Sequence, residues 1–148
     1  MELSAAGLAL LKVSEGLKPF EYLDMTGLRT IGYGHKLLPG EHYPNGITEA
    51  EATVILSKDV AIAEGAVGHL VRVALAQGQF DALVDFVFNL GQGKLAQSTL
   101  LKDLNAGQYD AAAQQLLLWD HVGVREVSAL KTRRAAEYQL WTGHAPAK

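Results

Sequence analysis

The sequence contains no cysteine among its 148 residues. That absence excludes disulfide bonds, thiolate catalysis and cysteine-based zinc sites, and it argues against a redox role. The five histidines include no His-x-x-x-His pair of the kind that binds zinc on a helix. We therefore expect neither a metal site nor a cofactor, and the lack of thiols suits a protein that matures in a reducing cytosol.

Long apolar runs are also missing. The run from Ala5 to Leu11 is interrupted by Gly7 and follows Glu2 instead of a basic residue. It is therefore a poor signal peptide, and it is too short to cross a bilayer. We expect no signal peptide, no stable membrane insertion and synthesis in the cytoplasm.

Positive charge is scarce as well. Thirteen Lys and Arg residues against sixteen Asp and Glu give a formal net charge of -3, which argues against a dedicated nucleic-acid-binding protein. What is present is a globular composition, with 49% hydrophobic and 20% charged residues. The length suits one domain that buries a sizeable core.

Helical spacing, capping residues and Gly- or Asn-bearing breaks predict an α+β fold made mainly of helices. The expected segments are a first helix from a Ser4 cap to about Ser14, a β-hairpin over 19–33, an irregular loop over 34–47, a long helix from a capping box at Thr48 and Glu51 to about Gly65 or Gly68, a helix ending at 89–91, short helices over 98–105 and 108–119, and a last helix over 128–141. We expect a small lobe at about 1–47, a connecting helix at about 48–67 and a helical lobe at about 68–143.

Two carboxyl side chains come from different elements of the small lobe. Glu15 ends the first helix below an apolar stripe, whereas Asp24 lies in the hairpin turn and Thr30 follows on the returning strand. Hydrolysis of a glycosidic bond needs one carboxylic acid and one carboxylate facing each other across a gap. An apolar setting would keep Glu15 protonated, and a solvated turn would keep Asp24 ionised. Residue types and spacing alone favour an ordinary structural role for both residues, because a Glu at a helix end and an Asp in a turn are common in soluble proteins.

Longer strings of sequence narrow that choice. The informative strings are Ser14-Glu15-Gly16, Tyr22-Leu23-Asp24-Met25-Thr26-Gly27, Thr30-Ile31-Gly32-Tyr33-Gly34-His35, Gly46-Ile47-Thr48, Gln79-Phe80-Asp81-Ala82-Leu83-Val84, Phe86-Val87-Phe88-Asn89-Leu90-Gly91, Ser98-Thr99-Leu100-Leu101 and Arg133-Arg134-Ala135-Ala136-Glu137. Together they span nearly the whole chain. They resemble the phage-type lysozymes of glycoside hydrolase family 24, the endolysins and muramidases of tailed phages and prophages.

The resemblance implies a single lysozyme-like domain with an active-site cleft between its two lobes. It implies cleavage of the β-1,4 bond between N-acetylmuramic acid and N-acetylglucosamine in peptidoglycan. Glu15 would be the general acid, and Asp24 and Thr30 would hold the attacking water. Attack by free water inverts the anomeric centre and requires carboxyl groups roughly 6.5–9.5 Å apart, whereas a separation near 5 Å favours a covalent intermediate.

The resemblance also indicates supporting residues. Phe88, Asn89 and Thr99 would line the sugar cleft, although Phe88 is equally compatible with the core. We expect His35 to pair with an acid on the long helix, with Asp59 as the candidate, in a structural role near the site.

Charged residues of the helical lobe have simpler expected roles. Asp81 and Asp85 should lie off the apolar stripe of their helix. Lys131 and its neighbours Arg133 and Arg134 could attract an anionic cell wall, but a solvated helix face is the preferred interpretation, with Arg133 and Glu137 as an exposed pair.

As a lysozyme, the protein would act on bacterial peptidoglycan as a monomer, in the lysis of a bacterial host. It would wait in the host cytoplasm until a holin permeabilised the membrane. Two other functions stay open at this point. One is a lytic transglycosylase, which forms an anhydro product without a second carboxylate, and the other is a non-catalytic wall-binding protein on the same scaffold.

Overall fold

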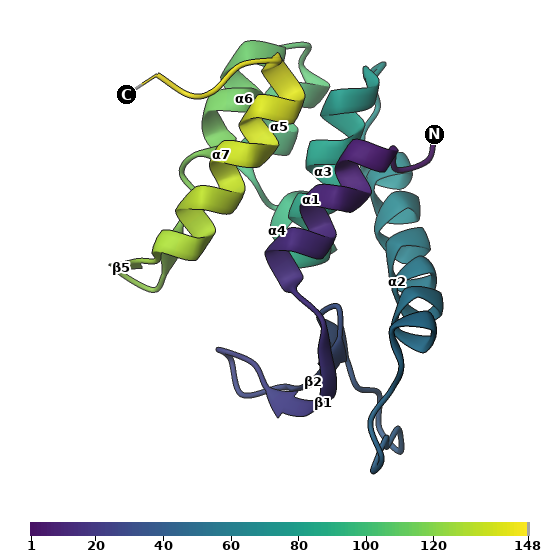
Figure 1. Ribbon diagram of the computed structural model, residues 1–148. Coiled ribbons are helices and arrows are strands. Elements are labelled where there is room, and N and C mark those ends of the chain that lie inside the picture. The colour runs from purple at the N-terminus through teal and green to yellow at the C-terminus, as the bar shows by residue number, and fades with distance from the viewer. Residues whose placement is uncertain (148) are drawn as a thin grey trace.

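The computed structural model describes residues 1–147 and shows a mixed α+β fold in which helices predominate (Figure 1). The helices of this described part are α1 (Ala5–Glu15), α2 (Glu49–Leu70), α3 (Gln77–Leu90), α4 (Gln92–Ala96), α5 (Thr99–Asn105), α6 (Tyr109–Leu116) and α7 (Ser128–Thr142). The strands are β1 (Lys18–Leu23), β2 (Arg29–Gly32), β3 (His35–Lys36), β4 (His121–Val122) and β5 (Arg125–Glu126). The fold class expected from the sequence is confirmed.

The first three strands form a small antiparallel sheet next to α2 (Figure 1). Tyr22 lies opposite Thr30 across β1 and β2, and Ile31 lies opposite His35 across β2 and β3. The third strand lies inside the segment that the sequence predicted to be an irregular loop. That prediction was wrong for these two residues because Gly34, at a φ of 71°, turns the chain back so that it pairs with β2.

Helix α2 connects the sheet to the remaining helices. Its predicted capping box is confirmed: the Thr48 hydroxyl accepts from the amide of Glu51, and the Glu51 carboxylate accepts from the amide of Thr48, both at 3.1 Å. The helix continues through Gly65 and Gly68 to Leu70, beyond its predicted end. Tertiary packing outweighs the low helix propensity of the two glycines, since Ala66 and Val67 between them are buried.

Helix α3 forms the centre of the helical part and packs against α1, α2 and α7. Every residue from Phe80 to Val87 is buried. Asp81 and Asp85, expected off the apolar stripe, are therefore inside the protein, with exposed fractions of 2% and 0%. Both carboxylates are hydrogen-bonded there: Asp81 accepts from the Ser4 amide, and Asp85 binds Arg133. Bonded burial of this kind avoids the cost of an isolated charge.

The last helix corrects two expectations. Arg133 is 6% exposed, while Arg134 and Glu137 are 0% exposed, so they form neither a solvated face nor an exposed pair. The reason is that α7 lies against α3 and turns these side chains toward the buried carboxylate of Asp85. Lys131 alone of the predicted cluster is exposed, and it pairs with Glu126 at 3.3 Å.

Short elements account for the other differences. Helix α4 and the two-stranded sheet of β4 and β5 were not predicted because each is too short to show a periodic pattern. Helix α6 ends at Leu116, three residues before its predicted end. Over residues 1–147, no helix combines the length and the apolar composition that crossing a membrane requires.

Candidate active site

Glu15 is the last residue of α1 and its carboxyl group is mostly covered, with 15% of the side chain exposed. The Ser4 hydroxyl caps the start of this helix, and the buried Leu11 fixes the face that carries Glu15 inward. Its surroundings are not simply apolar as expected, because Oε2 accepts a hydrogen bond from Nη1 of Arg133 at 2.5 Å. The candidate acid is therefore fixed by a residue of α7.

Gly34 covers the other oxygen of this carboxyl group. A Cβ atom built on Gly34 would lie 2.3 Å from Oε1 of Glu15 and 2.8 Å from its Cδ. No side chain other than hydrogen fits in that space, and the φ of 71° also favours glycine. The turn between β2 and β3 thus presses backbone directly against the candidate acid.

Asp24 closes the turn that joins β1 to β2. Its Oδ1 accepts from the amides of Thr26 and Leu28 at 2.8 and 2.9 Å and from the Thr26 hydroxyl at 2.7 Å. Lys36 of β3 donates to Oδ2 at 2.5 Å. The Lys36 ammonium, followed by these backbone and hydroxyl donors, outweighs burial and holds the pKa of Asp24 well below its usual range. Asp24 stays ionised, as the sequence predicted.

Thr30 lies in the middle of β2 and is completely buried. Its hydroxyl donates to the carbonyl of Leu28 at 2.9 Å. Because that bond uses the only proton on Oγ1, any further hydrogen bond to Thr30 has to come from a donor.

Tyr22 of β1 is influenced by the charges of both Glu15 and Asp24. Burial first, and then the negative charges of Glu15 and Asp24, raise the pKa of the Tyr22 phenol above 10. Geometry agrees with this, because Glu15 lies against Gly34 and Asp24 binds Lys36, only two positions further along the chain. The structure therefore brings Glu15 and Asp24 to the same region of the molecule.

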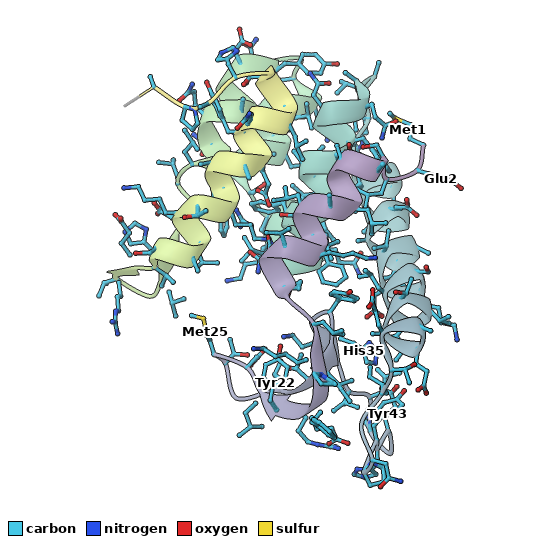
Figure 2. The ribbon with its side chains drawn as sticks, in the orientation of Figure 1. Met1, Glu2, Tyr22, Met25, His35 and Tyr43 are labelled. Carbon is cyan, nitrogen blue, oxygen red and sulfur yellow. The ribbon has the colours of Figure 1, made fainter. Side chains whose placement is uncertain are left out.

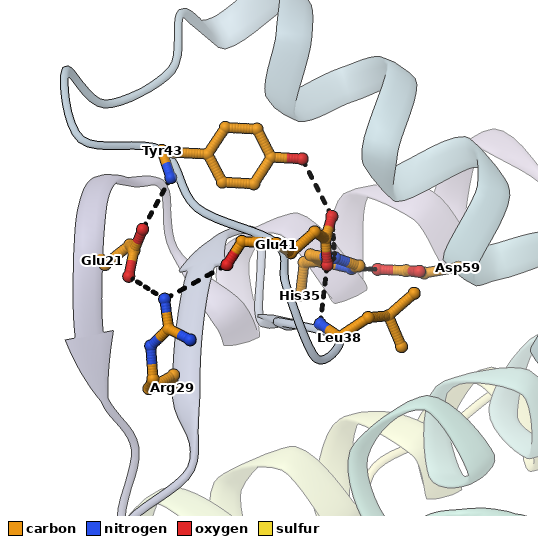
Figure 3. Close-up of polar contacts among 7 residues, drawn as sticks. All are labelled: Glu21, Arg29, His35, Leu38, Glu41, Tyr43 and Asp59. Atoms are coloured by element: carbon orange, nitrogen blue, oxygen red, sulfur yellow. Dashed lines mark hydrogen bonds and ion pairs between the residues drawn. The ribbon is translucent and has the colours of Figure 1, made fainter.

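His35 pairs with Asp59, as the sequence predicted, through Nδ1 and Oδ2 at 2.7 Å. The second ring nitrogen contacts Glu41 at 3.0 Å, a partner that was not predicted (Figure 3). Burial lowers the pKa of His35, but the hydrogen bonds to Glu41 and Asp59 outweigh burial and raise it overall. His35 thus links the sheet to α2 and lies in the interior of the small lobe (Figure 2).

Glu41 also orders the loop after β3. It accepts from the amide of Leu38 at 2.7 Å and from the hydroxyl of Tyr43 at 2.9 Å (Figure 3). The hydrogen bond from the Leu38 amide, followed by that from His35, lowers the pKa of Glu41 despite partial burial. The loop is therefore fastened to the same histidine that contacts α2.

The three predicted sugar contacts lie on α3 and α5. Phe88 is half-buried and packs against the core, Asn89 is half-buried, and Thr99 is exposed. Nη2 of Arg134 donates to Oδ1 of Asn89 at 2.7 Å. Ser98 is the N-cap of α5, because its hydroxyl accepts from the amide of Leu101 at 3.0 Å.

A hollow of about 380 Å³ separates the hairpin turn from the helical lobe. Met25 lines it on one side and Val122 with residues 125–128 on the other. Figure 2 shows Met25 extending from the turn toward the segment around β5. Since Met25 follows Asp24 directly, this opening adjoins the candidate site.

Sequence reasoning missed the residues that hold the two carboxyl groups. Arg133 and Asp85 gave no signal as a pair, because they lie on helices far apart in the sequence. Lys36 had a weak signal, since it follows the Gly-Tyr-Gly-His string and lies on the strand next to the hairpin. Gly34 stood within a quoted string, but only the structure shows its contact with Glu15.

Comparison with known proteins assigns the family. The sequence model of the phage lysozyme family matches residues 12–137. The endolysin of Salmonella phage P22 is 38% identical over 144 residues, which cover 95% of this chain and 98% of that protein. The muramidase domain of SpmX from Asticaccaulis excentricus has a TM-score of 0.85 at 34% identity, covering 95% of this chain and 97% of the other. An endolysin from Escherichia coli O157:H7 phage FAHEc1 has a TM-score of 0.84 at 33% identity, covering 99% and 98%.

The matched segment contains the whole constellation from Glu15 to Arg133. Homologues named as endolysins and a muramidase, together with the shared fold, identify an enzyme of the glycoside hydrolase class. The chain belongs to the phage lysozyme family.

Proposed function

We propose that this lysozyme cleaves the β-1,4 bond between N-acetylmuramic acid and N-acetylglucosamine with inversion at the anomeric carbon. Glu15 donates a proton to the bridging oxygen as the bond breaks. Asp24 binds the water that attacks from the other face of the sugar and accepts its proton. In this scheme no covalent bond to the protein forms.

The observation that carries the proposal is the contrast between the hydrogen bonds that hold the two carboxyl groups. Asp24 accepts four hydrogen bonds and has a lowered pKa, so it is ionised and can accept a hydrogen bond from a water. Glu15 is held through Oε2 alone, and over residues 1–147 its Oε1 has no hydrogen-bond partner. That oxygen is free to carry the proton that a sugar oxygen receives.

Thr30 has a narrower role in this mechanism. Because Thr30 is completely buried, its hydroxyl supports the water through Leu28. It holds the Leu28 carbonyl, and the Leu28 amide binds the Asp24 carboxylate that holds the water. Thr30→Val removes the hydroxyl but keeps the size and branching of the side chain, so it should weaken the binding of this water.

Asn89 is proposed to recognise an acetamido group of the substrate. The guanidinium of Arg134 can only donate, so the amide oxygen of Asn89 faces Arg134 and the amide nitrogen faces away. An NH2 group that faces away from Arg134 suits the carbonyl oxygen of an acetamido group. Thr99, exposed at the start of α5, adds a hydroxyl for sugar binding.

Replacing each carboxyl group by its amide tests the assignment. Glu15→Gln and Asp24→Asn should each slow the clearing of outer-membrane-stripped cells by about 10²–10⁴-fold. Glu49→Gln and Asp110→Asn make the same changes on the surface and should leave clearing unchanged. Full activity of Glu15→Gln would refute the assignment of the acid. Anhydro-muramic products in mass spectra, or full activity of Asp24→Asn, would instead indicate a transglycosylase.

The product configuration tests inversion directly. Nuclear magnetic resonance of freshly cleaved peptidoglycan fragments should show the α-anomer of the new reducing end before mutarotation. An initial β-anomer would require a covalent intermediate and would overturn the role given to water.

We also propose that the enzyme is a monomer that waits in the host cytoplasm and depends on a holin for its release. The similarity to phage endolysins supports this proposal. Light scattering should give a mass near 15.9 kDa. Induced cells should lyse only when a membrane-permeabilising protein is co-expressed, and lysis without one would contradict the dependence on a holin.

A further inference from the structure

Asp85 is a buried carboxylate that takes no direct part in the proposed chemistry. It lies on α3 and binds Arg133 of α7 through both oxygens, with Nε to Oδ2 and Nη2 to Oδ1 each at 2.9 Å. This paired geometry occupies two of the three guanidinium nitrogens and leaves Nη1 to reach Glu15. Asp85 therefore fixes the direction from which the candidate acid is held.

Arg133 presents a conflict for a general acid. A guanidinium in contact with a carboxyl group favours the ionised carboxylate, typically by 1–3 pH units. A general acid has to remain protonated at the working pH, so an uncompensated Arg133 would oppose the reaction. Asp85 supplies a compensating negative charge in the same buried cluster, where low polarity strengthens both interactions.

We propose that Asp85 is a positioning residue that neutralises Arg133, so that Arg133 orients Glu15 by a hydrogen bond without drawing off its proton. This inference depends on the proposed role of Glu15 as the general acid. Asp85 would thus help to set the pH range of activity through its contact with Arg133.

The other ionisable groups around this cluster have different roles. Burial raises the pKa of Glu137 well above its usual range despite the nearby Arg134, which favours its neutral form. Arg134 directs Nη2 to Asn89 and Glu137. In the small lobe, the pKa of Tyr22 is raised, which favours its neutral form, and Asp24 is paired with Lys36. Over residues 1–147, the anions that contact Arg133 are thus Glu15 and Asp85.

Two opposite substitutions test the proposal through the alkaline limb of the pH profile of kcat/KM. Asp85→Asn leaves Arg133 uncompensated and should move this limb to lower pH by about one unit, a tenfold loss at a fixed pH on the limb. Arg133→Gln leaves Asp85 unpaired near Glu15 and should move the limb to higher pH. Asp110→Asn, exposed on α6, makes the same charge change as Asp85→Asn and should move neither limb.

Glu137 has to be controlled because it could ionise when Asp85 is removed. In a Glu137→Gln background, Asp85→Asn should therefore shift the limb at least as far. Soluble peptidoglycan fragments are the substrate, so that the charge of intact walls does not distort the profile. A purely structural defect would lower the maximum of the profile, but it would not move the alkaline limbs of the two variants in opposite directions.

The outcomes separate the two proposals. If folded Asp85→Asn keeps the wild-type limb, or if both variants shift in the same direction, the role of Asp85 is refuted while that of Glu15 stands. If Asp85→Asn does not fold, the double variant Asp85→Asn/Arg133→Gln removes both charges together. An alkaline limb at lower pH than that of the wild type would then refute the proposal. Activity of Glu15→Gln would refute the role of Glu15 itself.

Discussion

The two carboxyl groups of the site are held in contrasting ways. Asp24 takes its hydrogen bonds from Thr26, Leu28 and Lys36, all within twelve positions of it in the sequence. Glu15 is held by Arg133, which lies 118 positions away and is itself held by a residue 48 positions from it. The two carboxyl side chains are equally covered, each 15% exposed, but their partners differ: Asp24 is held locally by the exposed Lys36 and by its own turn, whereas Glu15 is held by a buried arginine that joins three helices.

This difference shows which part of the site depends on the rest of the fold. The surroundings of Asp24 form with the small sheet, because its partners belong to the turn and to the neighbouring strand. The surroundings of Glu15 exist only when α1, α3 and α7 are packed together. Changes that disturb packing should therefore affect the acid before they affect the base.

Among changes to the surroundings of the two carboxyl groups, the largest effect is expected from Gly34→Ala, which acts on Glu15. The new methyl group would overlap Oε1 of Glu15, so the carboxyl group has to move away from its position beside Arg133. A displacement of about 1 Å at a reacting group can cost about 10²-fold in rate. Clearing assays on stripped cells should show a loss of this size.

Gly107→Ala is the matched control. Gly107 also has a positive φ, of 80°, but a Cβ there would contact nothing within 4 Å. It should therefore share the backbone strain of Gly34→Ala, about 1–2 kcal/mol, without the loss of rate. Equal rates for the two variants would show that Gly34 does not position Glu15.

The same contrast explains how much could be predicted from the sequence. The turn at Asp24, the capping box at Thr48 and the helix ending near Asn89 depend on neighbours a few positions apart, so their patterns are visible in the sequence. The pairing of His35 with Asp59 was also predicted, because His35 ends a quoted string and Asp59 is an acid on the neighbouring long helix. Apart from the His35–Asp59 pair, the deciding interactions in these predictions are local.

The rest required long-range packing. Arg133 and Glu137 stand four positions apart, which in the sequence is typical of an exposed ion pair. Their burial follows from the fit of α7 against α3, and no single segment contains that information. The same fit makes Asp85 a partner of Arg133, although its place among apolar neighbours gives no sign of a charged contact. Sequence thus identified the two carboxyl groups but not the residues that orient Glu15.

A smaller effect is expected from Lys36→Met, which acts on Asp24. Removing the ammonium raises the pKa of Asp24 toward its ordinary value of 3.8, so this base is protonated sooner as the pH falls. The acidic limb of the activity profile should move to higher pH by about one unit, while the alkaline limb stays in place.

Lys102→Met is the control for this substitution, because Lys102 is an exposed lysine of α5 away from the sheet. Its profile should coincide with that of the wild type. If Lys36→Met moved the alkaline limb instead, the two carboxyl groups would not be independent, and the local description of Asp24 would be wrong.

The smallest effect on lysis is expected from Asp59→Asn, which changes stability and leaves both carboxyl groups in place. His35 has a raised pKa in the folded protein, so its contribution to stability is complete below about pH 6.5 and is lost as the pH rises through the folded value. Glu41 has a lowered pKa, so its contribution is present above about pH 4.5 and is lost as the pH falls. The cluster therefore stabilises the fold most between these two values.

Urea unfolding at two pH values checks this prediction. Near pH 5.5, Asp59→Asn should lower the free energy of unfolding by about 2 kcal/mol, because it removes a hydrogen bond between charged groups. Near pH 8.5 the loss should be smaller by about half or more, because His35 is then neutral. Asp110→Asn, on the surface of α6, should change the free energy of unfolding by less than about 0.5 kcal/mol at either pH. An equal loss at both pH values would mean that the pair is held by shape and neutral hydrogen bonding, and that protonation of His35 does not strengthen the link between the sheet and α2.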